Sequence, residues 1–335
     1  MRAKRFSRRT VLSGTAALTA AAILPRASLG AGDWRPTETV RIIVPAAAGG
    51  STDVMGRLLA AHLQTAWGQS AVVENRSGGG GTIGTSEVTR AKGDGHTILV
   101  GNPGPNAIAY SIFKNLTYKP DQLQPVSNMI RIPNIVSAHP KTGIKSIPEL
   151  IAYLKANPDK LSYASSGVGQ SPHLTGAWFL QLTGLKMTHI PFRGAGPALQ
   201  AALAGDIQIL FDNLYPSLPQ VQNGTLNGLC VTTTERSDLA PNLPTMRESA
   251  PELASFDISS WFCVFLPKTA PAPVLDELNL QIKAMLERED IKKQIAAMGA
   301  RADYGTPQQF AAFVEAETKK FAGIIQKEGL QMEVK

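Results

Sequence analysis

The feature that most constrains the fold is a regular alternation of short apolar runs with longer amphipathic runs, from residue 40 onward. Short β-branched runs are typical of buried strands, and the longer runs have the spacing of helices. Strands are predicted at 40–44, 71–74, 97–101, 135–138, 161–164, 188–191, 207–211, 228–232 and 259–266. Helices are predicted at 53–66, 83–91, 147–156, 174–183, 195–204, 215–223, 272–287, 290–298 and 307–327. This order predicts an α/β fold with mainly parallel sheets.

A chain of 335 residues is long for a single core, so two domains are expected. The sequence contains no low-complexity linker between them. We therefore expect the chain to cross between two lobes on strands, leaving a cleft at a hinge. The predicted boundaries place residues 31–135 and 257–335 in domain 1, and residues 136–256 in domain 2.

The first 30 residues have the pattern of a secretory signal. A basic start is followed by fourteen small or apolar residues, Val11–Leu24, and then by Ser28 and Gly30 ahead of Ala31. This pattern predicts export to the periplasm with cleavage near Gly30. The stretch Ser7–Leu12 resembles a twin-arginine motif, and an ordinary Sec signal is the alternative. No cysteine stands directly after the apolar stretch, at the expected cleavage site, so a lipoprotein anchor is not expected.

The net charge of +7 comes mostly from this signal, which holds six basic residues and no acid. The rest of the chain is nearly neutral, so the basic surface that nucleic-acid binding needs is not expected. The two cysteines, Cys230 and Cys263, both lie in apolar runs. They could pair in an oxidising compartment, but cysteines in such runs are more often small core residues. Two cysteines in unrelated contexts make no zinc site.

Several strand ends lead through a small-residue turn into a helix, and such helix starts bind anions through free backbone N–H groups. The first turn follows the strand 40–44 and has no Lys or Arg, which favours a carboxylate over a phosphate. The second follows 161–164, the third contains Arg193, and the fourth contains Asn102. The candidate ligand-binding residues in these turns are Ala47, Ala48, Gly49, Gly50, Ser51, Thr52, Asp53, Asn102, Ser165, Ser166, Gly167, Gly169, His173, Arg193, Gly194 and Ala195.

Four candidates have a structural alternative to ligand contact. Asp53 lies in a first helical turn and could instead cap that helix. His173 could be a packing or capping residue, and Arg193 could form a surface salt bridge. Asp212 follows a predicted strand, where it could hydrogen-bond a ligand or cap the turn.

A run of glycines at 78–81, with Gly84, forms a GxGxxG pattern that is compared with dinucleotide-binding loops. The acid expected about 20 residues later is absent, because residue 104 is glycine. Thr85 stands where a phosphate-binding loop would have lysine. A flexible loop ahead of a helix is therefore the preferred interpretation, and no cofactor is expected.

No catalytic motif is found. The five histidines are scattered, and neither an HExxH nor a GxSxG sequence occurs. Without a base placed beside a nucleophile, an enzyme is not expected.

Several segments together resemble the Bug family, the periplasmic receptors of tripartite tricarboxylate transporters. They are IIVPAAAGGSTDVMGRLLA (42–60), GQSAVVENRSGGGGTIGTSEV (68–88), GDGHTILVG (93–101), KLSYASSGVGQSPHL (160–174), HIPFRGAGPALQAALAGDIQILFDN (189–213) and VTTTERSDLAPNLPTMRES (231–249). The resemblance implies a two-lobed type II periplasmic binding protein fold with the ligand between the lobes. It implies that the loops at 47–53 and 165–173 hold a carboxylate, partly through water. Residues 193–195 and Asp212 would line the other side.

The sequence departs from the family pattern in places that bear on the ligand. Relatives commonly carry an aromatic residue at Ala46, tyrosine at His96 and Phe192, and serine at Gln170. Phe262 and Cys263 follow Trp261 where small residues are often found. Phe262 is expected to line the pocket beside an aromatic ligand. These departures leave the ligand open between di- and tricarboxylates, aromatic acids and acidic amino acids.

The resulting hypothesis is a monomeric periplasmic receptor that captures a small carboxylate and delivers it to the membrane subunits of a tripartite tricarboxylate transporter. The sequence leaves a second hypothesis open, a periplasmic sensor that presents its ligand to a membrane kinase. A periplasmic hydrolase is the less favoured third.

Overall fold

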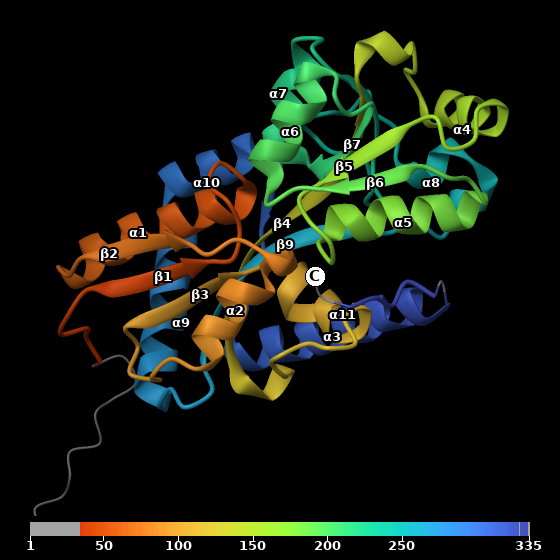
Figure 1. Cartoon of the computed structure of the whole chain (residues 1–335). Helices are drawn as coiled ribbons and strands as arrows, with labels where there is room; N and C mark the ends of the chain where they lie inside the picture. Colours follow the sequence, from red (N-terminus) through yellow and green to blue (C-terminus); the bar gives the residue numbers. More distant parts are fainter. Residues whose placement is uncertain (1–33, 328, 334–335) are drawn as a thin grey trace, which may run out of the picture.

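The structure is a computed structural model that describes residues 34–327 and 329–333. The predicted signal segment and its cleavage near Gly30 lie outside the described residues. The molecule has two lobes joined by two long strands, which run from one lobe into the other in Figure 1. The sheet order is β2-β1-β3-β9-β4-β7-β5-β6, with β8 and β10 each paired to β4.

Lobe 1 is built on the parallel strands β1, β2 and β3, together with β9, the first part of β4 and the short β10. The bounds of its strands are β1 Val40–Val44, β2 Ala71–Asn75, β3 Thr97–Gly101, β9 Ser259–Pro267 and β10 Arg301–Ala302. Its helices are α1 Ser51–Trp67, α2 Thr82–Thr89, α3 Ala109–Ile112, α9 Ala272–Glu287, α10 Glu289–Ala297 and α11 Pro307–Lys327.

Lobe 2 is built on the parallel strands β5, β6 and β7, together with β8 and the end of β4. Its own strands are β5 Ser162–Ser165, β6 Thr188–Pro191, β7 Ile209–Asn213 and β8 Asn227–Val231. Its helices are α4 Ile147–Ala156, α5 Ser171–Thr183, α6 Ala195–Ala204, α7 Leu214–Gln222 and α8 Met246–Ser249.

The connection between the lobes is the strand β4 Leu123–Ala138, which changes partners along its length. Its first part pairs with β9, from Leu123 opposite Pro267 to Pro133 opposite Ser259. From Asn134 onward it pairs with β7 and from Ile135 with β8. The chain therefore leaves and re-enters lobe 1 on two adjacent antiparallel strands.

The expectation of mainly parallel sheets is wrong at the centre of the molecule. The pairs among β1, β2 and β3 and among β5, β6 and β7 are parallel. Within the described part of the chain, each pair that involves β4 or β9 is antiparallel. The reason is that β4 and β9 carry the chain in opposite directions between the lobes.

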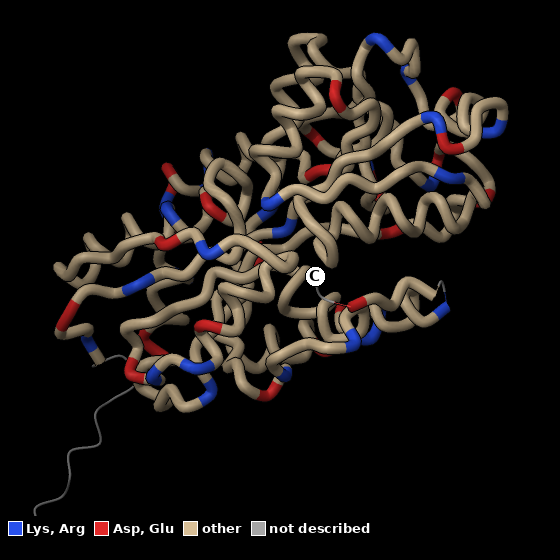
Figure 2. Tube along the Cα trace, viewed as in Figure 1, with Lys and Arg blue, Asp and Glu red and all other residues tan. Residues whose placement is uncertain are grey.

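Packing against the sheets follows the sequence pattern. Met55, Leu59 and Leu63 recur at helical spacing on α1 and are fully buried against the β1–β3 sheet. A Cβ on Gly56 would lie 2.6 Å from Val44 Cγ2, so glycine at this position lets α1 lie close to the sheet. Among the described residues no helix has the length and apolarity to cross a membrane. Charges of both signs are interspersed over both lobes (Figure 2).

The two cysteines are free and fully buried. Cys263 lies on β9 and Cys230 on β8, where its Sγ contacts Met246 Sδ. They are therefore small core residues, and the disulfide that the sequence left open does not form in the structure.

Candidate functional site

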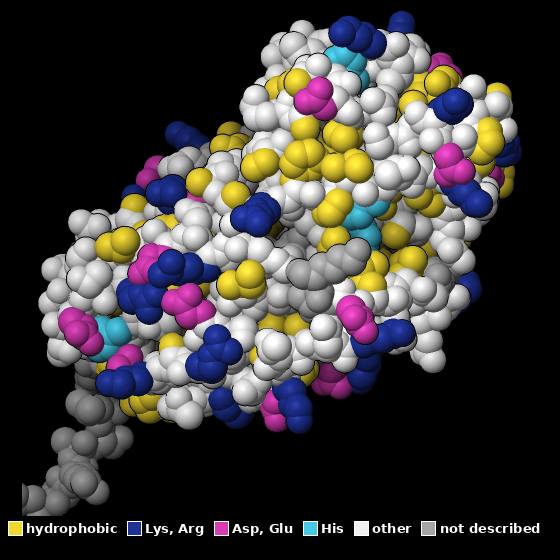
Figure 3. Space-filling view, viewed as in Figure 1, with side chains coloured by type: hydrophobic (Ala, Val, Ile, Leu, Met, Phe, Trp, Pro, Cys, Tyr) yellow, Lys and Arg dark blue, Asp and Glu magenta, His cyan; other side chains and the backbone are white. Residues whose placement is uncertain are grey.

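A cavity of about 620 Å³ lies between the two lobes and is lined by residues from both. Figure 3 shows the molecular surface from the side where the lobes meet. Lobe 1 contributes the β1–α1 turn, the glycine run at 78–81 and the end of β3. Lobe 2 contributes the turns that follow β5, β6 and β7. The cavity therefore lies at the carboxyl ends of the parallel strands, where α/β folds bind ligands.

Three helices begin at the cavity wall. Their first residues, Ser51 of α1, Ser171 of α5 and Ala195 of α6, all line it. None of the three N-cap residues accepts a hydrogen bond with its side chain from the helix it precedes. Free N–H groups and the positive ends of three helix dipoles therefore face one space, which favours an anion.

Ser51 is a second sign that this wall suits a hydrogen-bond acceptor. Its side chain is only 1% exposed and lines the cavity, yet its Oγ has no hydrogen-bond partner. A buried hydroxyl without a partner loses free energy, so such groups normally have a partner. A bound acceptor would supply one.

Asp53 does not line the cavity, although the sequence proposed it as a ligand contact. It is 4% exposed, and its Oδ2 accepts hydrogen bonds from Gly49 N and Arg57 Nε, each at 3.0 Å. Its Oδ1 accepts a third from Asn75 Nδ2 at 3.0 Å. Burial opposes ionisation, but these donors outweigh it and hold the pKa of Asp53 below its usual value. Asp53 holds the turn that carries Ser51, because it accepts from Gly49, which lies directly before the N-cap residue Gly50 of α1.

The lobe 2 wall rests on a stack of three rings. His189 stacks between Tyr163 and His173, with ring centroids 4.6 Å and 4.4 Å apart. Of the three, His189 lines the cavity, and its Nε2 lies 2.7 Å from Ser165 Oγ. His173 is buried and accepts a hydrogen bond from Gly169 N at Nδ1.

Both histidines of this stack are neutral at ordinary pH. Burial disfavours their charged forms and lowers the pKa of His173 to about 4 and that of His189 to about 3. The neighbouring His173 ring lowers the pKa of His189 further. The wall therefore offers the ligand a neutral imidazole, which can donate or accept one hydrogen bond.

At the end of β7, Asn213 reaches the cavity wall whereas its neighbour Asp212 lies buried behind it. Asp212 is 1% exposed and does not line the cavity; its carboxyl accepts hydrogen bonds from Ser217 Oγ and from Asn213 N. Burial raises its pKa to about 7. Asn213 does line the cavity, and its amide donates to Asn134 Oδ1 and Ser260 Oγ. The residue that reaches the cavity is thus the neighbour of the predicted one.

Arg193 is the cation that the wall offers. It is exposed and lines the cavity, and its guanidinium forms no hydrogen bond or ion pair with the other described residues. The surface salt bridge considered from the sequence does not form. Its backbone oxygen accepts a hydrogen bond from Ala47 N at 3.2 Å, which joins the two lobes beside the cavity.

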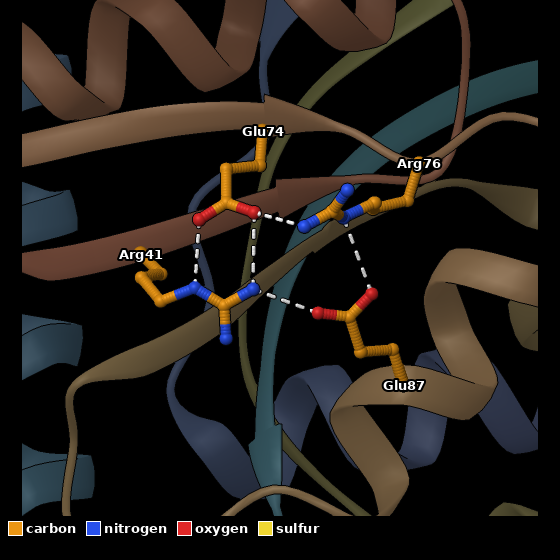
Figure 4. Close-up of polar contacts among 4 residues, drawn as sticks. All are labelled: Arg41, Glu74, Arg76 and Glu87. Atoms are coloured by element: carbon orange, nitrogen blue, oxygen red, sulfur yellow. Dashed lines mark hydrogen bonds and ion pairs between the residues drawn. The ribbon is translucent and has the colours of Figure 1, made fainter.

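The glycine run, expected to be a flexible loop, forms part of the wall: Gly78, Gly79, Gly80 and Gly81 all line the cavity. Its two ends are joined by a ring of ion pairs formed by Arg41, Glu74, Arg76 and Glu87 (Figure 4). Glu74 and Arg76 lie directly before the run, and Glu87 lies on the helix after it. The ring therefore fixes the base of a loop whose own residues have no side chains.

The cavity brings together most but not all of the predicted site residues. It is lined by Ala47, Gly50, Ser51, Thr52, Asn102, Ser166, Gly167, Arg193, Gly194, Ala195 and Phe262. The structure places Ala48, Gly49, Asp53, Ser165, Gly169, His173 and Asp212 behind or beside this wall. Wall residues that were not proposed include Gly78–Gly81, Phe113, Gln170, Ser171, His189, Asn213, Ser260 and Met332. Gln170 and the glycine run could have been proposed, because they lie in loops that follow a predicted strand and precede a helix. No sequence pattern marks Phe113 or Met332 as wall residues.

The described residues include no group of three or more His, Cys, Asp or Glu side chains that could hold a metal ion. Ser165 and His189 form a close pair, but Ser165 is 0% exposed and does not line the cavity. The arrangement favours binding of an anion over attack on a bond.

Comparison with known proteins agrees with this geometry. The family model described as tripartite tricarboxylate transporter family receptor matches residues 55–330. Protein BugT of Bordetella pertussis is 34% identical over 303 residues, which are 90% of this chain and 92% of that protein.

Two solved structures are similar over most of the chain. One, from R. palustris, is Rpa4515 with adipate, with a TM-score of 0.85 and 33% identity, covering 89% of this chain and 99% of that one. The other is the periplasmic binding protein BugD, with a TM-score of 0.84 and 32% identity, covering 88% and 99%. The fold is therefore the two-lobed fold of the periplasmic binding proteins, and the chain belongs to the tripartite tricarboxylate transporter family receptors, the Bug proteins.

Proposed function

We propose that this protein captures a small carboxylate in the periplasm and delivers it to the membrane subunits of a tripartite tricarboxylate transporter. The observation that carries the proposal is Ser51, a buried hydroxyl without a partner at the first of three helix N-termini that face one cavity. A carboxylate is the anion that this wall suits, because hydroxyl and backbone donors satisfy a single charge. The adipate-bound relative supports the same class of ligand.

In this proposal the two lobes close on the ligand as a hinged pair. Lobe 1 supplies Ser51, Thr52 and Asn102, and lobe 2 supplies Arg193 and the N-terminus of α5. The proposed domain boundaries lie after residue 135, within β4, and after residue 256, shortly before β9. We propose a monomer without catalytic activity, exported by its first 30 residues.

The ligand's carbon skeleton would lie against the apolar part of the wall. Ala46 and Phe262 both line the cavity, and Phe113 lines it near the glycine run. Ala46 leaves space where relatives commonly carry a ring, and Phe262 supplies a ring from β9. We infer that this pair sets the preference among aliphatic dicarboxylates, aromatic acids and acidic amino acids.

Thermal unfolding of residues 31–335 with a panel of carboxylates tests the proposal. A ligand that binds only the folded state raises the Tm by an amount that grows with the logarithm of its concentration over Kd. The panel contains adipate, L-malate, citrate, benzoate and L-glutamate, and at least one is expected to raise the Tm. Ser51→Ala should then weaken its binding by about ten- to a hundredfold, the effect of losing one hydrogen bond to a charged group.

Thr65→Ala is the matched control on the same helix, because the Thr65 hydroxyl lies on the exposed side and donates to Ala61 O. Its affinity should equal that of the wild type. If the protein binds none of the panel but hydrolyses an ester or amide, the proposed receptor function is contradicted.

A further inference from the structure

We propose that Gln170 is an interlobe latch: its side-chain amide docks on the Gly80 carbonyl when the lobes close and sets how long the ligand stays bound. The proposal rests on the proposed function, in which the lobes close around the ligand. It assigns to this chain a positioning residue whose side chain reaches from lobe 2 to the backbone of lobe 1.

The contact joins the two lobes at one edge of the cavity. Gln170 precedes α5 in lobe 2, and its Nε2 donates to Gly80 O of lobe 1 at 2.7 Å. The side chain is 8% exposed, so water competes little for this hydrogen bond. Although Gln170 is the N-cap residue of α5, its side chain accepts nothing from that helix. It reaches across to the other lobe instead.

Glycines in lobe 1 make the docking site. A Cβ on Gly80 would lie 1.8 Å from Val168 O, a backbone atom of lobe 2 that cannot move aside on its own. A Cβ on Gly104 would lie 2.7 Å from the Gln170 amide. The four-glycine run is thus the surface that lets the backbones of the two lobes meet. This gives the run a role that neither a nucleotide loop nor a flexible loop explains.

A second interlobe contact lies elsewhere on the cavity wall, where Ala47 N donates to Arg193 O. That bond joins two backbones, so side-chain substitution leaves its atoms in place. The Gln170 bond uses a side chain and can be removed alone. The ring of Arg41, Glu74, Arg76 and Glu87 holds the base of the glycine run, so the docking surface keeps its position while lobe 2 moves.

A latch and a purely structural hydrogen bond make different predictions for Gln170→Met, which keeps the length of the side chain and removes the donor. If the bond forms only on closure, the variant should release adipate about three- to tenfold faster. Its association rate and the Tm of the ligand-free protein should stay those of the wild type. If the bond is structural, the ligand-free Tm falls as much as the liganded Tm, and the latch is overturned.

Gly80→Ala should act more strongly, because the added methyl group meets the Val168 carbonyl only in the closed form. We expect adipate to bind at least about tenfold more weakly. Gly184→Ala is the matched control: Gly184 and Gly80 share a φ of +64°, but nothing lies within 4 Å of a Cβ at Gly184. Equal losses in the two alanine variants would assign the effect to backbone strain and contradict the docking surface.

Single-molecule Förster resonance energy transfer tests the latch without any ligand, because it follows the opening and closing of the lobes directly. Lys92→Cys in lobe 1 and Lys160→Cys in lobe 2 place dyes on exposed positions, while both native cysteines are buried. The closed state of the ligand-free Gln170→Met variant should last about three- to tenfold less long than that of the wild type. Unchanged dwell times, or a wild-type chain that never changes state, overturn the latch. Altered dwell times with no response to any carboxylate overturn the proposed function and leave the latch standing.

Discussion

Two acids stand beside the cavity, one in each lobe, and they are held in opposite ways. Asp53 of lobe 1 is surrounded by donors, including Arg57, and its pKa lies below the usual range. Asp212 of lobe 2 accepts hydrogen bonds from two neutral donors, Asn213 N and Ser217 Oγ, and burial raises its pKa to about 7. Identical side chains near the ends of parallel strands thus prefer different protonation states, because their surroundings differ.

The same difference extends to the walls that the two acids support. The lobe 1 wall is held by ion pairs, among them the ring below the glycine run (Figure 4). The lobe 2 wall is held by neutral groups, the ring stack of His173 and His189 and the amide network around Asn134. We conclude that salt should act mainly on lobe 1, and pH mainly on lobe 2.

The largest effect is expected in the neutral network. Asn134→Ala removes the partner of Asn213, Ser260 and Thr175 at a position with 0% exposure. The buried groups left without a partner should lower the free energy of unfolding by about 2–4 kcal/mol. Urea unfolding measures this change, with the exposed Asn223→Ala as the control. If Asn134→Ala lowers the free energy of unfolding no more than Asn223→Ala does, water replaces the hydrogen bonds of the network.

The two acids themselves give the sharpest comparison. Asp53→Asn removes charge-assisted hydrogen bonds from Arg57 and Gly49 and should lower the free energy of unfolding by about 1.5–3 kcal/mol at pH 8. Asp212→Asn at the same pH removes a buried charge and should cost nothing or stabilise the fold. Urea unfolding of both variants measures the difference. Equal losses at pH 8 would mean that Asp212 is held as an ion after all.

Acid should weaken the protein through the histidines of lobe 2. The pKa of His173 is about 4 in the fold, against about 6.5 when unfolded. Between these values the unfolded chain binds a proton that the folded chain does not, so stability falls as the pH falls. From pH 7.5 to pH 5 this costs about 2 kcal/mol, and His173→Gln should remove that share of the loss in thermal unfolding.

Asp212 should make stability depend on pH in the opposite direction to His173, so the two residues check each other. Its raised pKa means that the folded chain keeps a proton, between about pH 4 and pH 7, that the unfolded chain has lost. Its contribution to stability therefore falls as the pH rises through that window. The Asp212→Asn variant should lose more stability than the wild type on acidification from pH 7 to pH 5. If stability depends on pH in the His173→Gln and Asp212→Asn variants as it does in the wild type, the pKa shifts of these two residues are contradicted.

The smallest effect is expected in the ion-pair ring of lobe 1. Glu87→Gln removes two ion pairs between partly exposed side chains and should lower the free energy of unfolding by about 0.5–1 kcal/mol in dilute buffer. In 1 M NaCl the difference from the wild type should vanish. Glu315→Gln, which removes an exposed pair on α11, is the control. A loss that persists in high salt would assign Glu87 to packing.

Much of the architecture was predictable because its signals are local. The predicted helices at 147–156, 195–204, 272–287 and 307–327 have the bounds of α4, α6, α9 and α11. Ser146 caps the first of these and Gly205 ends the second. Capping residues and apolar spacing lie within a few positions of each other, so the sequence alone shows them.

The first part of β4 could not be predicted, because Pro125, Ser127, Asn128 and Pro133 interrupt its apolar pattern. The register against β9 shifts between Pro125 and Ser127, and such a bulge accommodates proline within a long strand. Its antiparallel pairing with β9 depends on residues far away in the chain. No local pattern records such a pairing.

The candidate site divides in the same way. The anion turns were found because a strand, small residues and a helix follow each other directly. The position of Asp53 had a readable signal, since Arg57 follows it at the i,i+4 spacing of helical ion pairs. The wall residues Phe113 and Met332 had none, because a bridge between these two segments brings them together only in the folded chain.

The pairing of β3 with β9 has a consequence for the order in which the protein can fold during synthesis. Leu99 lies opposite Phe265, and the whole of lobe 2 is synthesised between them. Lobe 2 pairs internally and can fold as soon as it leaves the ribosome, whereas β3 keeps an unpaired edge until β9 follows. The half of the receptor that is made first is therefore the half that is completed last, and its open edge needs protection from aggregation in the meantime.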